Sequence, residues 1–152
     1  MQLNNYFIFI LLLLLSYNSF AKKESEPKQT SFIKGQSIIK TRPNDTRAVY
    51  FTASNFDVES NDQKEDGKAL QKAINQVAKS KAKFGIVFIP EGNYIINQTI
   101  YIWKGVRLIG YGQNRPKFIL PANSEGFKEA NKYLLHFVDD MPRDGEEIQE
   151  AN

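Results

Sequence analysis

The sequence contains no cysteine, only one histidine and only one long apolar run in its 152 residues. Without cysteine the chain can form no disulfide framework, no cysteine-ligated zinc or iron–sulfur cluster and no cysteine nucleophile, and it has no attachment point for a lipoprotein's lipid. Without a second long apolar run it cannot be a polytopic membrane protein. The net charge is only +3, an excess too small to indicate a nucleic-acid partner.

The apolar run lies near the N-terminus, from Tyr6 to Leu15, and is followed by small residues at Ser19 and Ala21. A run of this length is typical of the central region of a signal peptide and is too short to cross a bilayer alone. We therefore expect residues 1–21 to be a signal peptide that is cleaved before Lys22. The protein would then be secreted or periplasmic and free of the membrane after cleavage. The alternative is an uncleaved N-terminal anchor, because the first five residues include no Lys or Arg.

The rest of the chain divides by composition into three parts. Residues 22–47 begin with a charged stretch that contains proline, and we expect a linker and N-terminal extension. Residues 48–138 carry the periodic apolar patterns of a folded domain. Residues 139–152 are acidic and have little apolar content, so we expect them to be poorly ordered.

One helix is predicted after an acidic loop at 57–67. Its apolar residues recur at helical spacing and form a single stripe, which comprises Ala69, Leu70, Ala73, Ile74, Val77 and Ala78. Asp66 sits at the N-cap position, and lysines lie at 79, 81 and 83, where the helix dipole favours cations. We therefore predict a helix over 67–79 that is capped by Asp66. The loop lacks the spacing of a calcium-binding EF-hand, which indicates a solvated loop instead.

From Gly85 the apolar period changes from 3.6 to 2. Short β-branched strands separated by turns are expected at 48–52, 86–89, 99–103, 106–109, 117–120 and 133–138. The pattern predicts a mainly β protein and is shared by sandwiches, barrels and β-solenoids.

Several motifs follow one another in a recognisable order. Asn61-Asp62 and Asp66 precede the helical Ala69-Leu70-Gln71-Lys72-Ala73-Ile74, and then come the turn Pro90-Glu91-Gly92-Asn93-Tyr94 and the strand end Gly105–Gly112. In this order and spacing, residues 55–121 resemble the N-terminal part of the pectate lyase superfamily, whose fold is a right-handed parallel β-helix. The loop departs from the family pattern, since Asn61 replaces its first glycine and only Asp66 remains of an aspartate pair.

The resemblance implies that the helix is a cap over the first coils of the β-helix. A solenoid needs a cap because its terminal coil would otherwise expose an apolar face and unpaired strand edges. Members of the family mostly cleave polysaccharides by hydrolysis or β-elimination, with catalytic groups on the middle coils. Such coils would lie beyond residue 152, so we expect a truncated chain in which no catalytic residue can be assigned.

The predicted function is therefore that of the N-terminal portion of an exported polysaccharide-degrading enzyme, a glycoside hydrolase or polysaccharide lyase, that is inactive on its own. Two alternatives stay open: a non-catalytic module that binds glycans or a surface, and a truncated reading frame without independent function. The expected partner is a polysaccharide, with an acidic glycan as one candidate. The sequence identifies no cofactor and no metal site.

Tyr101 and Trp103 are the candidate sugar-binding residues, because they share one face of a predicted strand and aromatic rings are good platforms for sugar C–H bonds. The alternative is that both rings pack against the N-terminal segment or the cap. His136 lies inside an apolar strand, which favours a hydrogen-bonded core histidine over the alternative of a catalytic one. Asp139 and Asp140 are adjacent, so in a strand they would point to opposite faces, and a surface turn explains the pair better than catalysis.

Overall fold

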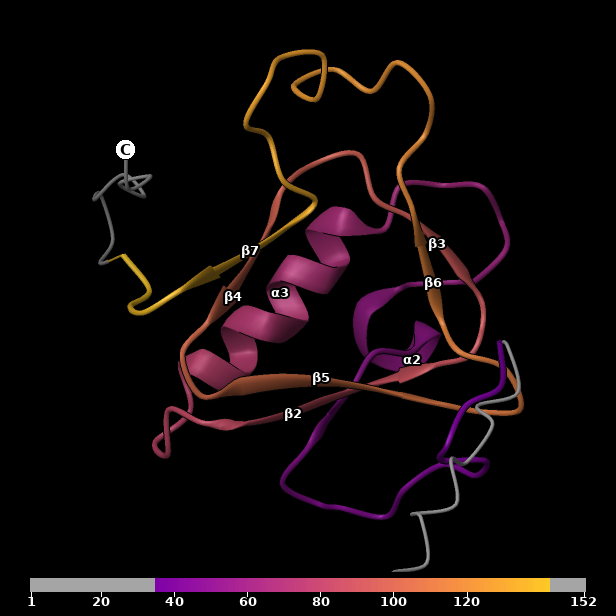
Figure 1. Cartoon of the computed structure of the whole chain (residues 1–152). Coiled ribbons are helices and arrows are strands. Elements are labelled where there is room, and N and C mark those ends of the chain that lie inside the picture. The colour runs from indigo at the N-terminus through magenta and orange to yellow at the C-terminus, as the bar shows by residue number, and fades with distance from the viewer. Residues whose placement is uncertain (1–34, 143–152) are drawn as a thin grey trace, which may run out of the picture. The chain divides into compact units, whose positions relative to one another are not determined.

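A computed structural model describes residues 35–142 of the chain (Figure 1). The predictions for the signal peptide, for the first half of the linker and N-terminal extension (22–34) and for most of the acidic end therefore lie outside the described residues. All described residues belong to one of the chain's two units, residues 33–152. Their elements are β1 (Val49–Tyr50), α2 (Ala53–Phe56), α3 (Gly67–Ala78), β2 (Gly85–Pro90), β3 (Asn93–Ile95), β4 (Ile100–Trp103), β5 (Val106–Tyr111), β6 (Lys117–Ile119) and β7 (Leu135–Val138).

The strands pair with a regular offset of three. Strand β2 pairs with β5, β3 with β6 and β4 with β7, and each of these pairs is parallel. Strand β1 adds to the other edge of β2, so that the largest sheet has the order β1-β2-β5. In Figure 1 the three pairs outline the sides of a triangle, because the chain passes twice through the same three strand positions. The protein is mainly β, as predicted.

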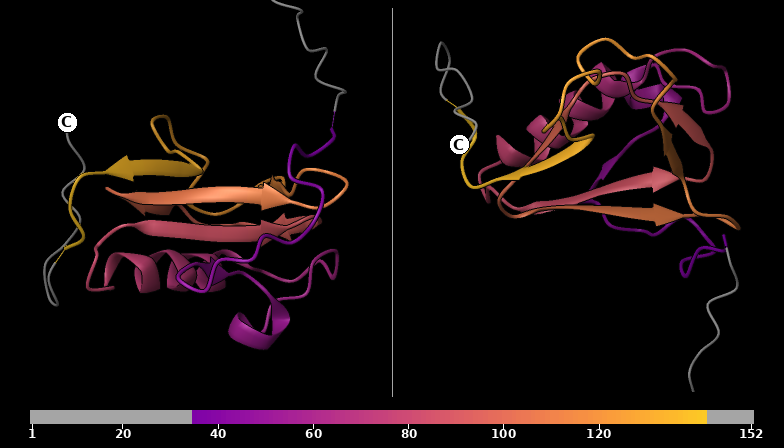
Figure 2. Two further views of the ribbon diagram at one scale, coloured as in Figure 1. Left: turned by 90° about the horizontal axis from the view of Figure 1, so that it is seen from below. Right: turned by 45° about the horizontal axis from the view of Figure 1, so that its top comes forward.

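Helix α3 lies against the first of these two passes. Its predicted apolar stripe is the face that it buries, and Leu70, Ala73 and Ile74 are fully excluded from solvent. The helix packs mainly against β1, β2 and β4. In Figure 2 the strands of the two passes form successive layers, and α3 lies beside the layer that contains β2.

The core between α3 and the strands is built from large apolar side chains. Its members include Val87, Ile89, Tyr94, Ile96, Ile100 and Ile102, all of which are at most 3% exposed. The turn between β4 and β5 depends on Gly105, whose φ is +83° and whose Cβ, if it had one, would lie 2.9 Å from the carbonyl oxygen of Lys83. A side chain at this position would force the two passes of the chain apart.

Most predicted elements are present with adjusted ends. The helix ends at Ala78, one residue before the predicted end, and the strand predicted at 106–109 extends to Tyr111. The strand predicted at 48–52 keeps only two residues, because the chain turns into α2, a short helix that was not predicted from the sequence. The strand predicted at 133–138 begins at Leu135.

The prediction that Asp66 caps α3 needs a correction. Asp66 occupies the N-cap position, but its side chain makes no cap hydrogen bond. Instead Asp66 Oδ2 accepts a hydrogen bond from the N–H of Ile95 at 3.0 Å, and the N–H of Asp66 donates to the carbonyl oxygen of Ile95 at 2.7 Å. The edge of β3 that does not pair with β6 has no further strand in its sheet, so its backbone groups need another partner. Burial raises the pKa of the Asp66 carboxyl, although the hydrogen bond from Ile95 opposes this shift.

Candidate functional site

The candidate site begins with the two aromatic residues of β4. Tyr101 and Trp103 alternate with the buried Ile100 and Ile102, as the sequence predicts. Their rings lie nearly parallel, with centroids 5.9 Å apart and an interplanar angle of 10°. The two side chains are therefore brought together on one side of the strand.

Trp103 does not present its ring to solvent. It is only 4% exposed and belongs to the core cluster, and its Nε1–H donates to Asn75 Oδ1 on α3 at 2.6 Å. A buried ring that is hydrogen-bonded to the helix matches the packing alternative for Trp103. The interpretation of Trp103 as an exposed sugar platform is therefore corrected, because α3 holds the indole.

Tyr101 instead joins a row of rings that continues on the neighbouring strand. Tyr101 pairs in register with His136 of β7, and the two ring centroids are 5.6 Å apart. His136 in turn contacts Tyr133 at 6.1 Å, and Tyr133 is 58% exposed. Tyr101, His136 and Tyr133 form what we call the aromatic row, and it reaches solvent through Tyr133.

Neither His136 nor Tyr133 was predicted from the sequence to belong to such a row. His136 is half-buried beside Tyr101 and Tyr133, so the expectation of a core histidine is wrong. Tyr133 lies at the start of the strand predicted at 133–138, but the run Leu134-Leu135 breaks the alternation that would have assigned its ring to a face. Only the register between β4 and β7, two strands far apart in the sequence, brings the three rings together.

The described residues place no pair of carboxylates at this row. Asp139 and Asp140 are both exposed just after β7, and Asp139 Oδ1 lies 3.7 Å from Lys104 Nζ. Within residues 35–142, no three His, Asp or Glu side chains come together as a group that could hold a metal ion. What the aromatic row offers is flat apolar surface with an imidazole and a phenol at its edge, which suits contact with sugar rings.

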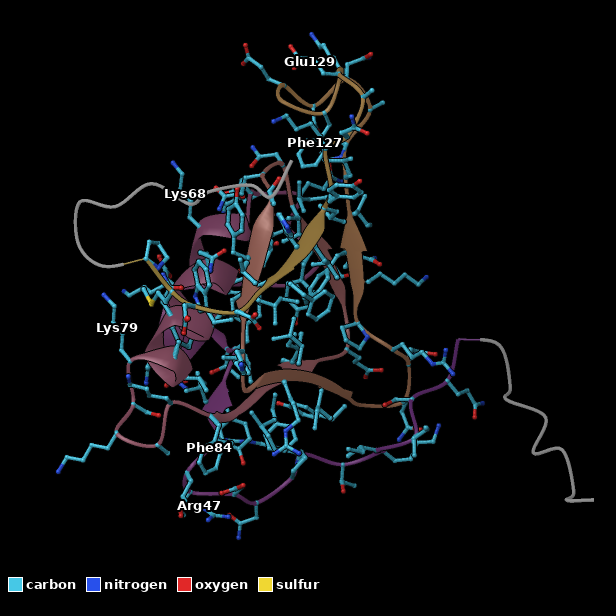
Figure 3. The ribbon with its side chains drawn as sticks, turned by 60° about the vertical axis from the view of Figure 1, so that its left-hand side comes forward. Arg47, Lys68, Lys79, Phe84, Phe127 and Glu129 are labelled. Carbon is cyan, nitrogen blue, oxygen red and sulfur yellow. The ribbon has the colours of Figure 1, made fainter. Side chains whose placement is uncertain are left out.

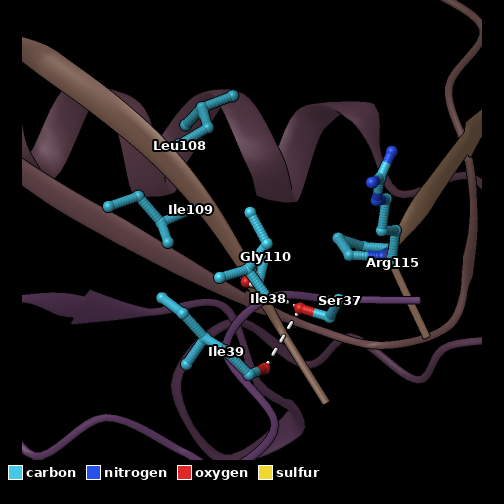
Figure 4. Close-up of a pocket in the computed structure, with 8 residues that line it drawn as sticks. Ser37, Ile38, Ile39, Leu108, Ile109, Gly110 and Arg115 are labelled. Carbon is cyan, nitrogen blue, oxygen red and sulfur yellow. Dashed lines mark hydrogen bonds between the residues drawn. The ribbon is translucent and has the colours of Figure 1, made fainter. Parts of the chain in front are cut away.

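A separate hollow of about 470 Å³ lies where residues 37–39 run beside the edge of β5 (Figure 4). It is lined mainly by apolar groups, among them Ile38, which is 79% exposed, and Leu108. The Ser37 hydroxyl donates to the carbonyl oxygen of Ile39 at 3.0 Å, and Arg115 Nε donates to the carbonyl oxygen of Gln36 at 2.9 Å. The polar groups that the hollow contains are therefore bound to the chain's own backbone.

A family model described as rhamnogalacturonase A/epimerase, pectate lyase-like, matches residues 50–143. The chain belongs to this family. The match spans α2, α3 and strands β2 to β7, so it covers the strand pairs and the aromatic row. The predicted resemblance to the N-terminal part of a pectate lyase superfamily protein is confirmed.

Comparison with curated proteins and with solved structures gave no match. Membership of a pectate lyase-like family indicates a carbohydrate-active protein. Among the described residues, neither helix has the length and apolar content needed to span a bilayer.

Proposed function

We propose that this chain forms the capping helix and the opening coils of a right-handed parallel β-helix in an exported, polysaccharide-degrading protein. The described coils would bind the polysaccharide or support the rest of the β-helix. Cleavage of glycosidic bonds would need catalytic groups that these coils do not carry. The observation that carries the proposal is the three-strand offset of the parallel pairs within a chain that belongs to a pectate lyase-like family.

The stacking of like residues supports the β-helix. Buried residues of the first pass lie in register with apolar residues of the second: Val87 with Leu108, Tyr94 with Phe118 and Ile102 with Phe137. Parallel crossover connections are right-handed in nearly all proteins, which supports the proposed hand. Helix α3 then acts as the cap, because it covers the apolar side chains of the first pass.

The second pass is covered far less well than the first. Ile102 is 3% exposed, whereas Phe137, its partner in register, is 73% exposed. Strands β5, β6 and β7 are each the last strand of their sheet on the side away from α3. An apolar face beside three strand edges is what a following coil would cover, so we propose that a complete β-helix has further coils on this side.

The substrate class follows from the family description, which names a rhamnogalacturonase and an epimerase. A rhamnogalacturonase acts on a polysaccharide that contains uronic acid, so we propose polysaccharides of this kind as the substrate class. Hydrolysis of a glycosidic bond needs two facing carboxylates about 5–10 Å apart. Asp139 and Asp140 are adjacent and exposed at the end of β7, which supports the proposal that these coils do not cleave glycans.

The test is to produce the full chain in an exporting host and to incubate the purified protein with rhamnogalacturonan and polygalacturonate. We expect no new reducing ends and no ultraviolet absorbance from unsaturated uronates, and N-terminal sequencing should begin at Lys22. Release of either product would refute the proposal that the coils are inactive alone. A protein that still begins with Met1 would refute the cleaved signal peptide.

A further inference from the structure

The outer side of α3 is a second surface with its own chemistry. Five lysines lie between residues 68 and 83, and no Asp or Glu occurs between residues 67 and 90. Three of these lysines, Lys68, Lys72 and Lys79, are exposed along the helix, and we call them the lysine row. None of the ion pairs formed among the described residues involves the lysine row.

Helical geometry aligns the lysine row. The spacing i, i+4 and i+11 places the three side chains on one face, opposite the stripe that contains Leu70 and Val77. At 1.5 Å per residue, the row is about 16 Å long. Figure 3 shows Lys68 and Lys79 near the two ends of α3, both pointing away from the strands.

Neutral hydrogen-bonding groups lie beside the cations. The row borders a shallow hollow of about 460 Å³ that is also lined by Gln76 and Gln98. Gln76 is exposed, and a primary amide both donates and accepts hydrogen bonds, as sugar hydroxyls require. The surface therefore combines spaced positive charges with groups that suit hydroxyls.

The acidic loop before α3 does not neutralise this surface through its nearest carboxylates. Asp62 lies 3.2 Å from Lys64, and Glu65 Oε1 accepts a hydrogen bond from the N–H of Gly67 at 2.6 Å. Asp66 is buried and bound to Ile95. These three carboxylates are thus engaged within the loop and the strand edge, and none of them forms an ion pair with the lysine row.

We propose that the lysine row on α3 binds an acidic polysaccharide, with its ammonium groups against successive uronate carboxylates and the neighbouring amides against hydroxyls. This inference rests on the proposed polysaccharide function. A linear chain that carries many carboxylates matches a straight row of cations in charge, because each lysine can meet a different carboxylate along the chain. The row lies on the cap, apart from the aromatic row on β4 and β7, so it would hold a substrate chain without cleaving it.

Other polyanions fit this surface less well. A membrane-bound helix needs an apolar face turned to the lipid, whereas the apolar face of α3 is buried in the core. Recognition of double-stranded nucleic acid depends on many cationic contacts to phosphates, and the net charge of the whole chain is only +3. The amides beside the lysines add hydroxyl recognition, which favours a glycan.

The experiment compares three variants of the full chain by affinity electrophoresis or a sensor surface at low salt. The first replaces Lys68, Lys72 and Lys79 by Gln, and the second replaces them by Arg. The matched control replaces Lys104, Lys117 and Lys128 by Gln, which removes the same charge from exposed sites elsewhere. The ligands are polygalacturonate, its fully methyl-esterified form, double-stranded DNA and vesicles that contain phosphatidylserine.

We expect the original chain to bind polygalacturonate, to release it as salt is raised, and to ignore the esterified form. The Gln variant should bind about tenfold more weakly, because each exposed ion pair contributes only a few-fold on its own. The Arg variant should keep the affinity, and the control should stay within about twofold of the original chain. Thermal melting checks that all variants are folded.

The proposal would be overturned by unchanged binding in the Gln variant, by an equal loss in the control, or by no binding of polygalacturonate at all. Tighter binding to DNA or to vesicles would assign the surface to another partner and would also overturn it. None of these results depends on the product assay, so failure here is distinct from failure of the proposed function. Conversely, release of products from glycans would refute the inactivity of the coils and would leave the lysine row standing.

Discussion

Gln71 on α3 forms two hydrogen bonds to the backbone of Tyr101 on β4. Gln71 Oε1 accepts from the N–H of Tyr101 at 2.8 Å, and Gln71 Nε2 donates to the carbonyl oxygen of Tyr101 at 3.0 Å. The side-chain amide thus supplies the same donor and acceptor that a neighbouring strand would offer. Gln71 thereby supplies hydrogen-bond partners for the N–H and the carbonyl oxygen of Tyr101, at an edge of β4 where α3 takes the place of a neighbouring strand.

Two further residues do the same for β3. The N–H of Asn61 donates to the carbonyl oxygen of Asn93 at 2.9 Å, and Asn61 Oδ1 accepts from the N–H of Asn93 at 3.1 Å. Asp66 makes the equivalent pair of bonds with Ile95. Together with β1, which covers the edge of β2, these residues satisfy the strand edges on the side of α3.

The first prediction concerns Gln71. Gln71→Ala should lower the free energy of unfolding by about 1–3 kcal/mol, because two part-buried backbone groups of Tyr101 lose their partners. The free energy of unfolding of Gln71→Glu should lie between those of the original chain and of Gln71→Ala, since a carboxylate still accepts from the N–H of Tyr101 but cannot donate to its carbonyl oxygen. Gln76→Ala, on the exposed side of the same helix, is the control and should change stability by less than about 0.5 kcal/mol. Urea unfolding measures all three, and equal effects of Gln71→Ala and Gln76→Ala would contradict the edge role.

The second prediction concerns the charge of Asp66. Its pKa is raised by burial, so the folded state holds the proton more tightly than the unfolded state. The contribution of Asp66 to stability is therefore largest at acid pH and is lost as the pH rises from about 3.8, the ordinary value, through the raised pKa. Asp66→Asn keeps an acceptor for Ile95 without the charge, and we expect it to be at least as stable as the original chain at neutral pH.

Asp66→Ala is the matched variant for that test. It removes the acceptor as well as the charge, so it should be about 1–3 kcal/mol less stable than Asp66→Asn at every pH. Unfolding in urea across the acid range gives both comparisons. If Asp66→Asn proved as unstable as Asp66→Ala at neutral pH, the negative charge itself would be the stabilising feature.

The third prediction concerns alkaline pH. Burial raises the pKa of Tyr94 to about 12, and its hydroxyl donates to the carbonyl oxygen of Pro90 at 3.0 Å. Between pH 10.0, the ordinary pKa, and about 12 the unfolded state loses the proton first, so stability falls as the pH rises through this range. The loss should reach about 2–3 kcal/mol.

Tyr94→Phe isolates this effect. The variant loses the hydrogen bond to Pro90 at all pH values, but it has no phenol to ionise. Its stability should therefore fall less steeply above pH 10 than that of the original chain, and unfolding monitored by circular dichroism would show the difference. Parallel pH profiles would mean that Tyr94 does not carry the alkaline dependence.

The fourth prediction separates the two aromatic roles on β4 and β7. Trp103→Ala should destabilise the protein by about 3–5 kcal/mol, because it empties a buried site against α3. Tyr133→Ala should leave stability within about 0.5 kcal/mol, because the side chain is mostly exposed. If the aromatic row binds glycan, Tyr133→Ala should also weaken glycan binding by about 1 kcal/mol.

Melting temperature and glycan affinity, measured on the same samples, distinguish the outcomes. A stable Trp103→Ala variant with weakened glycan binding would restore Trp103 as an exposed platform. Trp103→Phe removes the hydrogen bond to Asn75 but keeps an aromatic ring in the core. It should therefore lower the free energy of unfolding by less than Trp103→Ala does.

The sequence predicted those features that depend on neighbours along the chain. The stripe from Ala69 to Ala78 recurs at helical spacing, and this pattern alone places α3 almost residue for residue. The strands that build the second pass were also expected, because β-branched runs between turns need no distant information. The family motifs added the order in which these elements stack.

The functions of particular side chains were harder to predict because they depend on distant contacts. Asp66 stands where a cap should be, yet its partner is Ile95, 29 residues further along the chain. Trp103 stands on the predicted face, yet Asn75 holds it from a helix 28 residues earlier. Composition and periodicity describe a residue's local setting and do not say which edge of a distant strand needs a partner.

Because the strand edges beside α3 are already hydrogen-bonded, further strands can pair only on the opposite side of the first pass. A chain is synthesised from its N-terminus, so this end can be completed before later residues emerge. Strands β2, β3 and β4 of the first pass would then offer their free edges to β5, β6 and β7, which pair with them on the side away from α3. Asn61, Asp66 and Gln71 would thus direct growth to one side of the stack, because they occupy the edges of β3 and β4 that another strand would otherwise pair with.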